Sequence, residues 1–298
     1  MAASIIDGRA IAKKVRAEVA EEVERFKKVH GYPPGLAVII VGDDPASRVY
    51  VGSKKRMCEA LGIYSEEYAL PASTTQEELI GTIRNLNNNK KIHGILVQLP
   101  LPDHLDEGEV LETIDPRKDV DGFHPISVGN FVVGKEAFVP CTPLGVLRLI
   151  KETGIEIKGK KAVVAGRSNI VGKPAAMLLL ANHATVTICH SRTEGLPGVC
   201  READILVAAI GRPEMLDGSY IKPGAVVIDV GVNEVGRTEE GKRILVGDVK
   251  FDEAKEIASH ITPVPGGVGP MTIAMLMRNT MDAAWRQAGK GGCGCSCK

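Results

Sequence analysis

Two side chains suited to catalysis lie four positions apart in the first third of the sequence. Tyr50 and Lys54 fall in the segment Ser47–Arg56, which is predicted to be helical, and residues four apart share one face of a helix. An aromatic ring therefore lies beside an amine. Burial and the cationic neighbours Lys55 and Arg56 would disfavour the charged form of that amine and let it accept a proton. The alternative is a solvated basic helix face.

Other polar residues of the same half follow apolar segments. Gln98 lies near the C-terminal end of the predicted strand 92–99, where ligands gather in open α/β sheets. Its amide is costly to bury without a partner, so a partner or ligand is expected. Asp119 and Asp121 alternate in the loop Lys118–Phe123. Two carboxylates would suit a cation, but no His or Glu cluster completes a metal site, and an Asx-type turn is the alternative.

The second half contains a glycine-rich turn. Strand 161–166 runs into Gly166–Pro174 and then an apolar helix. Glycines there let the backbone approach a diphosphate, which the free amides of the helix start attract. Ser168 replaces the second glycine of the dinucleotide fingerprint, and Gly172 comes one residue late for the third. Pro174 follows the lysine, and the glycine spacing is too long, so a P-loop is excluded. A turn that serves only packing is the alternative.

The end of the next strand indicates which dinucleotide is bound. An NAD enzyme usually places Asp or Glu about 20 residues past the glycines, to bind the ribose hydroxyls. This chain reads Cys189–Thr193 there and lacks the carboxylate. Ser191, Arg192 and the earlier Arg167 supply a hydroxyl and two guanidinium groups that suit a 2′-phosphate. NADP is therefore favoured over NAD, with solvated polar residues at a strand end as the alternative.

The elements that must position these residues alternate between helix and strand. Helices are predicted for 11–26, 46–61, 144–153, 171–182 and 271–287, with a further one opened by Thr74 or Thr75, and strands for 36–41, 64–70, 92–99, 161–166, 184–190, 205–210 and 226–230. Such alternation predicts parallel sheets, and the second half is typical of a doubly wound nucleotide fold. A Pro-rich segment, Ala137–Gly145, marks a domain boundary. The fold class is therefore α/β with two domains and a cleft between them.

The composition excludes several classes of function. Of 298 residues, 37 are Lys or Arg and 37 are Asp or Glu, so no basic excess favours nucleic acid or an anionic membrane. The apolar runs are too short to span a bilayer, and no signal peptide is recognised, which predicts a cytoplasmic protein. Four cysteines are scattered singly among apolar or helical segments and are expected to be buried thiols. Cys293, Cys295 and Cys297 lack the paired spacing of a zinc site, so no metal is expected, with soft-metal binding or crosslinking as the alternative.

Six short segments, in the same order along the chain, carry a resemblance to a known family. The chain resembles the bifunctional methylenetetrahydrofolate dehydrogenase/cyclohydrolase family over nearly its whole length, and the segments that carry this likeness are Tyr50–Lys54, Val97–Pro102, Lys118–Gly122, Pro140–Pro143, Gly166–Gly172 and Pro263–Thr272. The cysteine-rich tail after Gly289 lies outside the family pattern.

The resemblance implies two reactions on a folate one-carbon unit. The methylene bridge between two folate nitrogens loses a hydride to NADP, and water then opens the methenyl cation to 10-formyltetrahydrofolate. It implies catalytic roles for Lys54 and for Gln98, which holds it, and binding of tetrahydrofolate derivatives by Tyr50 and Asp121. It also implies a homodimer. The folate-binding catalytic domain is expected at 1–143 with 271–288, the dinucleotide-binding domain at 144–270, and the tail at 289–298.

Further site residues are expected around these. For the dinucleotide they are Gly166, Arg167, Ser168, Ile170, Gly172, Ser191 and Arg192, with Thr142, Gly231 and Val232 on the nicotinamide side. For the folate they include Pro265, Gly266 and Gly267, since glycine permits close backbone approach. Two rival functions are a shikimate-type NADP dehydrogenase, which leaves Tyr50, Lys54 and Gln98 without a role, and a non-catalytic nucleotide sensor.

Overall fold

The computed structural model describes residues 2–238 and 240–289, and these form two compact units. The three-stranded unit comprises 14–141 and 273–289, and the six-stranded unit comprises 2–13 and 142–272. The expected boundaries placed residues 1–143 together, whereas 2–13 group with the later residues. The reason is strand pairing, because β1 (Ser4–Ile5) joins β11 (His260–Ile261) in one parallel sheet.

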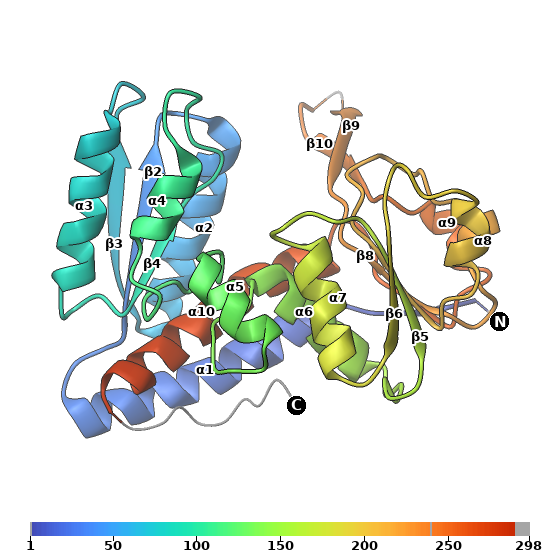
Figure 1. Cartoon of the computed structure of the whole chain (residues 1–298), viewed down its shortest axis with the longest axis horizontal. Coiled ribbons are helices and arrows are strands. Elements are labelled where there is room, and N and C mark those ends of the chain that lie inside the picture. Colours follow the sequence, from blue (N-terminus) through green and yellow to red (C-terminus); the bar gives the residue numbers. More distant parts are fainter. Residues whose placement is uncertain (1, 239, 290–298) are drawn as a thin grey trace. The chain divides into compact units, whose positions relative to one another are not determined.

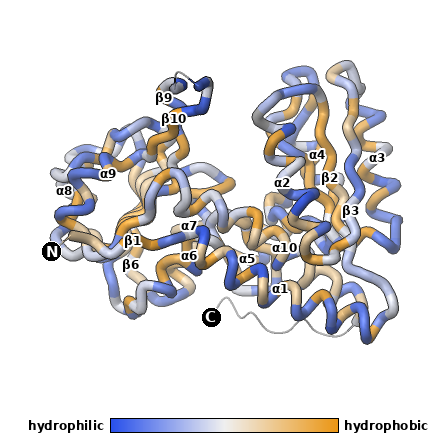
Figure 2. Tube along the Cα trace, turned by 180° about the vertical axis from the view of Figure 1, so that it is seen from behind, coloured by the Kyte–Doolittle hydropathy of each residue, from blue (hydrophilic) through white to orange (hydrophobic). Residues whose placement is uncertain are grey.

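The three-stranded unit is built on a parallel sheet in the order β3-β2-β4 (Figure 1). Its strands are β2 (Gly35–Val41), β3 (Tyr64–Leu70) and β4 (Gly94–Val97). Every residue of β2 is buried, and β2 is coloured hydrophobic in Figure 2. A central strand covered on both faces needs apolar side chains at every position, which explains its unbroken Leu, Ala, Val and Ile.

Helices surround this sheet. They are α2 (Pro45–Leu61), α3 (Gln76–Asn88), α4 (Glu107–Thr113) and α5 (Pro125–Val132), with most of α1 (Gly8–His30) and α10 (Val268–Gln287). α3 and α4 share one hydrophobic core with alternate residues of β2 and β4, including Ile39 and Ile95. Asp44 caps α2 by accepting from the Ser47 amide, and Thr75 and Glu78 form a capping box on α3.

The six-stranded unit has the predicted doubly wound topology. All neighbours in the order β1-β11-β8-β7-β5-β6 pair in parallel. The central strands are β5 (Lys161–Ala165), β6 (Thr185–Cys189), β7 (Ile205–Ala208) and β8 (Val226–Asp229), and α7 (Gly172–Ala181) connects β5 to β6. Because β6 and β7 pair on opposite sides of β5, the strand order reverses there. Dinucleotides bind at the carboxyl ends of strands at such a switch point.

Shorter elements complete this unit. They are α6 (Cys141–Glu152), α8 (Leu196–Cys200), η1 (Gly218–Tyr220), α9 (Phe251–Ala254) and the antiparallel pair β9 (Asn233–Arg237) and β10 (Arg243–Val246). Within the described ranges, Cys58, Cys141, Cys189 and Cys200 are buried free thiols, as expected. The remaining cysteines lie outside the described residues. No helix among the described residues has the length and apolar character needed to cross a bilayer.

Candidate active site

Lys54 and Gln98 are in direct contact in the three-stranded unit. Lys54 Nζ donates to Gln98 Oε1 over 2.9 Å, and Lys54 is only 9% exposed. Gln98 lies one residue beyond β4, where its backbone amide still donates to Ile39 O at 2.8 Å. Its side-chain Nε2 donates to Leu99 O at 2.7 Å, so the amide oxygen is turned toward the lysine. The partner that Gln98 required is therefore Lys54, and the solvated alternative for Lys54 is wrong.

Burial shifts the pKa values of Lys54 and of the nearby Asp121. Removal from water lowers the pKa of Lys54, while the nearby Asp121 carboxylate opposes that shift. Burial likewise raises the pKa of Asp121 to about 6, and Lys54 partly counters that shift. Of the two expected causes, burial is confirmed as the main influence, whereas Lys55 and Arg56 are exposed and do not contribute to the shift. A lowered pKa increases the fraction of Lys54 that is neutral and therefore able to accept a proton.

The loop that carries Asp121 is folded by Asp119. The buried Asp119 carboxylate accepts from the backbone amides of Gly122, Phe123 and His124 at 3.1, 3.2 and 2.9 Å. This is the Asx-type alternative, and it leaves Asp121 free for other contacts. Gly122 has a φ of +72°, and an added Cβ would lie 2.7 Å from the Val139 carbonyl carbon. In the part of the chain that the structure describes, no group of three or more His, Cys, Asp or Glu residues could hold a metal ion.

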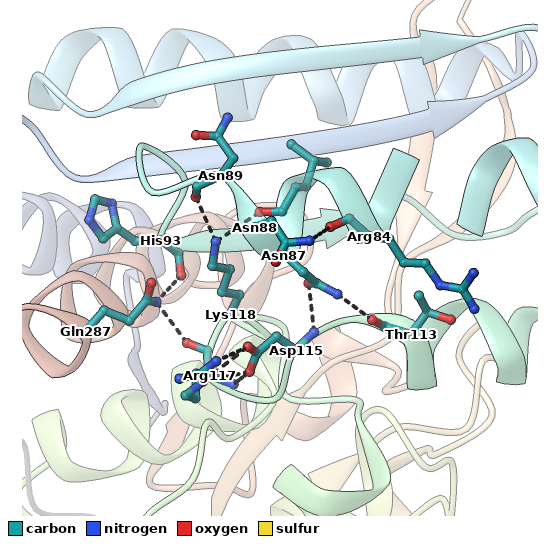
Figure 3. A network of polar contacts seen from close by, with 11 residues as sticks. Arg84, Asn87, Asn88, Asn89, His93, Thr113, Asp115, Arg117, Lys118 and Gln287 are labelled. Atoms are coloured by element: carbon teal, nitrogen blue, oxygen red, sulfur yellow. Dashed lines mark hydrogen bonds and ion pairs between the residues drawn. The ribbon is translucent and has the colours of Figure 1, made fainter. Parts of the chain in front are cut away.

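Lys118, at the start of the same loop, has a structural role. Its Nζ donates to Leu86 O and Asn89 O at 2.9 and 2.8 Å, at the C-terminal end of α3 (Figure 3). Gln287 of α10 donates to His93 O and Arg117 O at 2.7 and 3.0 Å. The loop is thus tied to α3 and α10 on the side before Asp119. A cavity of about 800 Å³ beside this network is lined by Lys118 and Gln287 but by none of the predicted catalytic residues.

Asn279 and Cys141 belong to this site, although neither was predicted as a site residue. The buried Asn279 Nδ2 of α10 donates to Val120 O at 2.8 Å and Val139 O at 3.1 Å, which joins the segments on either side of Gly122. The Cys141 thiol lies 3.7 Å from Asp121 Oδ1. An amide within a helix that is otherwise rich in apolar residues was a usable signal, because a buried amide needs partners.

Tyr50 lies one turn before Lys54 on α2. Its ring is 51% exposed, so an apolar surface is available beside the buried amine. An exposed ring at that place suits stacking against a planar ligand.

The ionisation of Asp121 gives a stability prediction. The folded-state pKa of about 6 lies above the ordinary 3.8, so the contribution of Asp121 to the free energy of unfolding is largest below pH 3.8 and falls as pH rises through about 6. The Asp121→Asn variant does not titrate. Relative to wild type, its free energy of unfolding should therefore increase as pH rises from about 4 to about 7.

Urea unfolding of the ligand-free chain across this pH range measures the difference. Asp103→Asn, at an exposed position of the same unit, controls for the loss of a charge. A difference between Asp121→Asn and wild type that stays constant with pH would contradict the raised pKa.

The glycine-rich turn lies at the switch point of the six-stranded unit. Gly166 has a φ of +137°, and an added Cβ would lie 2.1 Å from Ala209 O. An added Cβ at Gly172 would lie 2.3 Å from Gly166 O. Ser168 Oγ accepts from the amides of Val171 and Gly172, both at 3.2 Å. These two amides are thus already bonded within the turn, unlike the free helix-start amides expected from the sequence.

Two exposed arginines follow the paired strands β5 and β6. β5 and β6 are in register at Ala165 and Cys189, so the residues after both strands emerge at the same sheet edge. Arg192 donates its backbone amide to His190 Nδ1 at 3.1 Å, within a turn that leaves the side chains of Ser191 and Arg192 exposed. The side chain of Arg167 is also exposed. A backbone cradle without Cβ atoms beside two guanidinium groups fits a dinucleotide phosphate.

The remaining predicted cofactor residues lie in the same unit. Ile170 is exposed in the glycine-rich turn, and Thr142 Oγ1 shares a 2.9 Å hydrogen bond with Thr272 Oγ1. Gly231 is buried after β8, whereas Val232 is 51% exposed.

The loop Pro265–Gly267 lies against the start of α1. An added Cβ at Gly8 would lie 1.8 Å from Gly267 O, so there is no room for a side chain at position 8. Gly266 has a φ of +113°, which favours glycine.

Comparisons with known proteins cover both units. Residues 6–121 match the family described as "Tetrahydrofolate dehydrogenase/cyclohydrolase, catalytic domain", and residues 140–288 match its "NAD(P)-binding domain". The chain is 62% identical to the "Bifunctional protein FolD" of Moorella thermoacetica over 96% of this chain and 100% of that protein. The chain belongs to the tetrahydrofolate dehydrogenase/cyclohydrolase family.

Solved structures agree with this membership. The bifunctional FolD enzyme of Campylobacter jejuni is 49% identical, with a TM-score of 0.91 over 96% of this chain and 100% of that one. The Trypanosoma brucei methylenetetrahydrofolate dehydrogenase-cyclohydrolase, solved with NADP cofactor and inhibitor, is 42% identical, with a TM-score of 0.92 over 97% and 99%. The expected family and fold class are therefore confirmed for this tetrahydrofolate dehydrogenase/cyclohydrolase.

Proposed function

We propose that this chain carries out both reactions of its family on tetrahydrofolate derivatives. It oxidises 5,10-methylenetetrahydrofolate to the 5,10-methenyl form with NADP, and it hydrolyses the methenyl form to 10-formyltetrahydrofolate. The observation that carries this proposal is the buried Lys54, bonded to Gln98 and close to Asp121 within the unit that matches the family's catalytic domain.

The six-stranded unit holds the cofactor. Arg167, Ser191 and Arg192 bind the 2′-phosphate through charge-assisted hydrogen bonds, while Gly166 and Gly172 let the backbone approach the diphosphate. NADP, when bound, takes the hydride from the methylene bridge. Ile170, Thr142, Gly231 and Val232 are proposed as further contacts on this side.

Asp121 and Tyr50 bind the folate. At neutral pH a carboxylate with a pKa of about 6 is mostly ionised, so it accepts hydrogen bonds from the N–H donors of the pterin. Tyr50 offers its exposed ring as a stacking surface. Pro265, Gly266 and Gly267 are proposed to line the substrate through their backbone.

Lys54 acts in the hydrolysis. A water oxygen bonds to the methenyl carbon, and the neutral Lys54 Nζ accepts the proton that the water loses. The hydroxyl that results loses its own proton as the carbonyl forms, the bond from that carbon to N5 breaks, N5 takes up one proton, and the formyl group stays on N10. Gln98 Oε1 holds Nζ in place at 2.9 Å. A neutral amine also avoids repulsion with the cationic substrate.

One assay tests the proposed function. The chain is mixed with 5,10-methylenetetrahydrofolate and NADP, and NADPH formation and methenyl decay are followed together by absorbance. We expect NADPH to form only with the folate and the methenyl signal to decay faster than without enzyme. NADP reduction with shikimate instead would favour the shikimate-type rival, and NADP binding without turnover would favour the nucleotide sensor.

Deleting residues 291–298 is expected to leave both activities intact. This segment lies beyond residues 140–288, which match the family's NAD(P)-binding domain. The measurement is both rates together with the melting temperature. Loss of activity at an unchanged melting temperature would show that its thiols matter to function.

Two further properties belong to this proposal. A homodimer, implied by the resemblance, is tested by sedimentation of the purified chain, where a monomer at all concentrations would contradict it. A cytoplasmic location is tested by cell fractionation, with recovery in the membrane or secreted fraction as the contradicting result.

A further inference from the structure

Asp248 is a fully buried carboxylate whose hydrogen bonds gather a loop around it. It follows β10 and has an exposed fraction of 0%. Its Oδ2 accepts from the amides of Ile210 and Gly211 at 2.6 and 2.9 Å, and its Oδ1 accepts from the Arg212 amide at 3.0 Å. The side-chain amide of Asn233 donates a fourth bond to Oδ1 at 3.0 Å. Three consecutive backbone amides thus point at one side chain.

The loop that Asp248 gathers lies directly beside the glycine-rich turn. The Ala209 amide donates to Ala165 O at 2.7 Å, and Ala209 O occupies the place where a Cβ of Gly166 would lie. The loop 209–212 follows β7, and the turn follows β5, its neighbour in the sheet. The position of this loop therefore decides how much room remains at the switch point.

A second buried carboxylate holds Asp248 in place. Asp229 Oδ1 accepts from the amides of Asp248 and Gly231, both at 3.0 Å, and Asp229 Oδ2 accepts from the Val249 amide at 2.8 Å. The fit is tight around both groups. A Cβ at Gly231 would lie 2.2 Å from Asp248 Oδ1, and a Cβ at Gly247 would lie 1.8 Å from Asp229 Oδ2.

The buried position of the Asp248 carboxylate has an energetic cost that its hydrogen bonds must offset. Burying a carboxylate is unfavourable, and here N–H donors satisfy it at four points. A carboxylate only accepts, so it can turn several amides toward itself at once, which an amide side chain of the same shape cannot do. The backbone at 210–212 is therefore held in one conformation.

We propose that Asp248 is a positioning residue for dinucleotide binding. It fixes the loop after β7 against the Gly166 turn and so shapes the place that the dinucleotide enters. This inference rests on the proposed function, because it assumes that NADP binds at the switch point. Asp248 acts through the loop and not by contact with the cofactor.

The test compares Asp248→Asn with a matched control, Asp204→Asn, in the same unit. Asp204 precedes β7, at the opposite end from the loop, and accepts from the Lys161 amide at 2.9 Å and from Lys222 Nζ at 2.6 Å. Asp204→Asn therefore also weakens a carboxylate that holds backbone, but far from the turn. Calorimetry gives the Kd for NADP of the intact chain without folate, and steady-state kinetics give KM for each substrate and kcat.

For Asp248→Asn we expect the Kd and KM for NADP to rise by about 10-fold or more, the effect of losing a hydrogen bond to a charged group. The KM for folate should change little, and kcat at saturating NADP should be largely retained. Amide exchange at 210–212 should become faster. Asp204→Asn should lower the melting temperature without changing the Kd for NADP.

An unchanged Kd for NADP in a folded Asp248→Asn variant would overturn the inference, even with a lowered melting temperature. If that variant does not fold, Asn233→Ala removes one of the four donors, and a smaller rise in Kd is expected from it. No rise in that variant would also overturn the inference. A wild-type chain that binds no NADP would refute the proposed function itself.

Discussion

Replacing Lys54 by methionine is expected to slow hydrolysis of the methenyl substrate by roughly 10² to 10⁴, the usual loss when general acid-base help is removed. Methionine keeps much of the length and apolar stem of lysine but lacks the amine that contacts Gln98. Hydride transfer needs no proton at Nζ, so it should survive in part, although lost orientation can slow it. Methenyl product should therefore accumulate.

The experiment follows methenyl absorbance with time, and circular dichroism confirms folding. Lys55→Met is the matched control, because Lys55 is the next residue of α2 and is exposed. Both rates should be nearly unchanged in that variant. Unaltered hydrolysis in a folded Lys54→Met variant would remove Lys54 from the mechanism.

Reversing the charge of Arg192 should have the second large effect, on the choice of cofactor. The wild-type chain should prefer NADP over NAD by at least about 10-fold, because charge-assisted hydrogen bonds to the 2′-phosphate each contribute roughly 1.5 to 3 kcal/mol. Arg192→Glu should then lower kcat/KM for NADP by roughly 10-fold to 100-fold. The value for NAD should fall far less, because NAD lacks that phosphate.

Arg201→Glu supplies the control. Arg201 is exposed in the same unit but precedes β7, away from the carboxyl ends of the strands. The Arg201→Glu variant should have unchanged kcat/KM values for both NADP and NAD. Equal use of NADP and NAD by the wild-type chain, or an equal loss for both in Arg192→Glu, would contradict the assigned role of Arg192.

Much of the fold could be predicted because its signals are local. The strand 64–70 has the predicted bounds, and the helix expected to open at Thr74 or Thr75 is capped by Thr75. The parallel pair β1 and β11 was not predicted, because strands of two residues carry no periodicity. The antiparallel pair β9 and β10 was also missed, since both strands are short and largely exposed.

The site residues likewise divide into those expected from the sequence and those that only the structure reveals. The pairing of Lys54 with Gln98 was expected from the resemblance to the family, since the residues themselves indicated only that Gln98 needs a partner or ligand. Asn279 bonds to Val120, 159 positions away, and Asp248 bonds to Ile210, 38 positions away. No local pattern contains such partners. The role of Asp119 was open from sequence, since only the folded loop shows its three amide donors.

The pKa of Lys54 is the property on which the proposed hydrolysis most depends. It can be measured directly by NMR titration of the chain with ¹³C-labelled lysine side chains, using Lys54→Met to assign the resonance. Burial beside Gln98 predicts that Lys54 loses its proton at a lower pH than the ordinary value of 10.5, and before the exposed lysines do. A Lys54 resonance that titrates together with the exposed lysines would contradict this account.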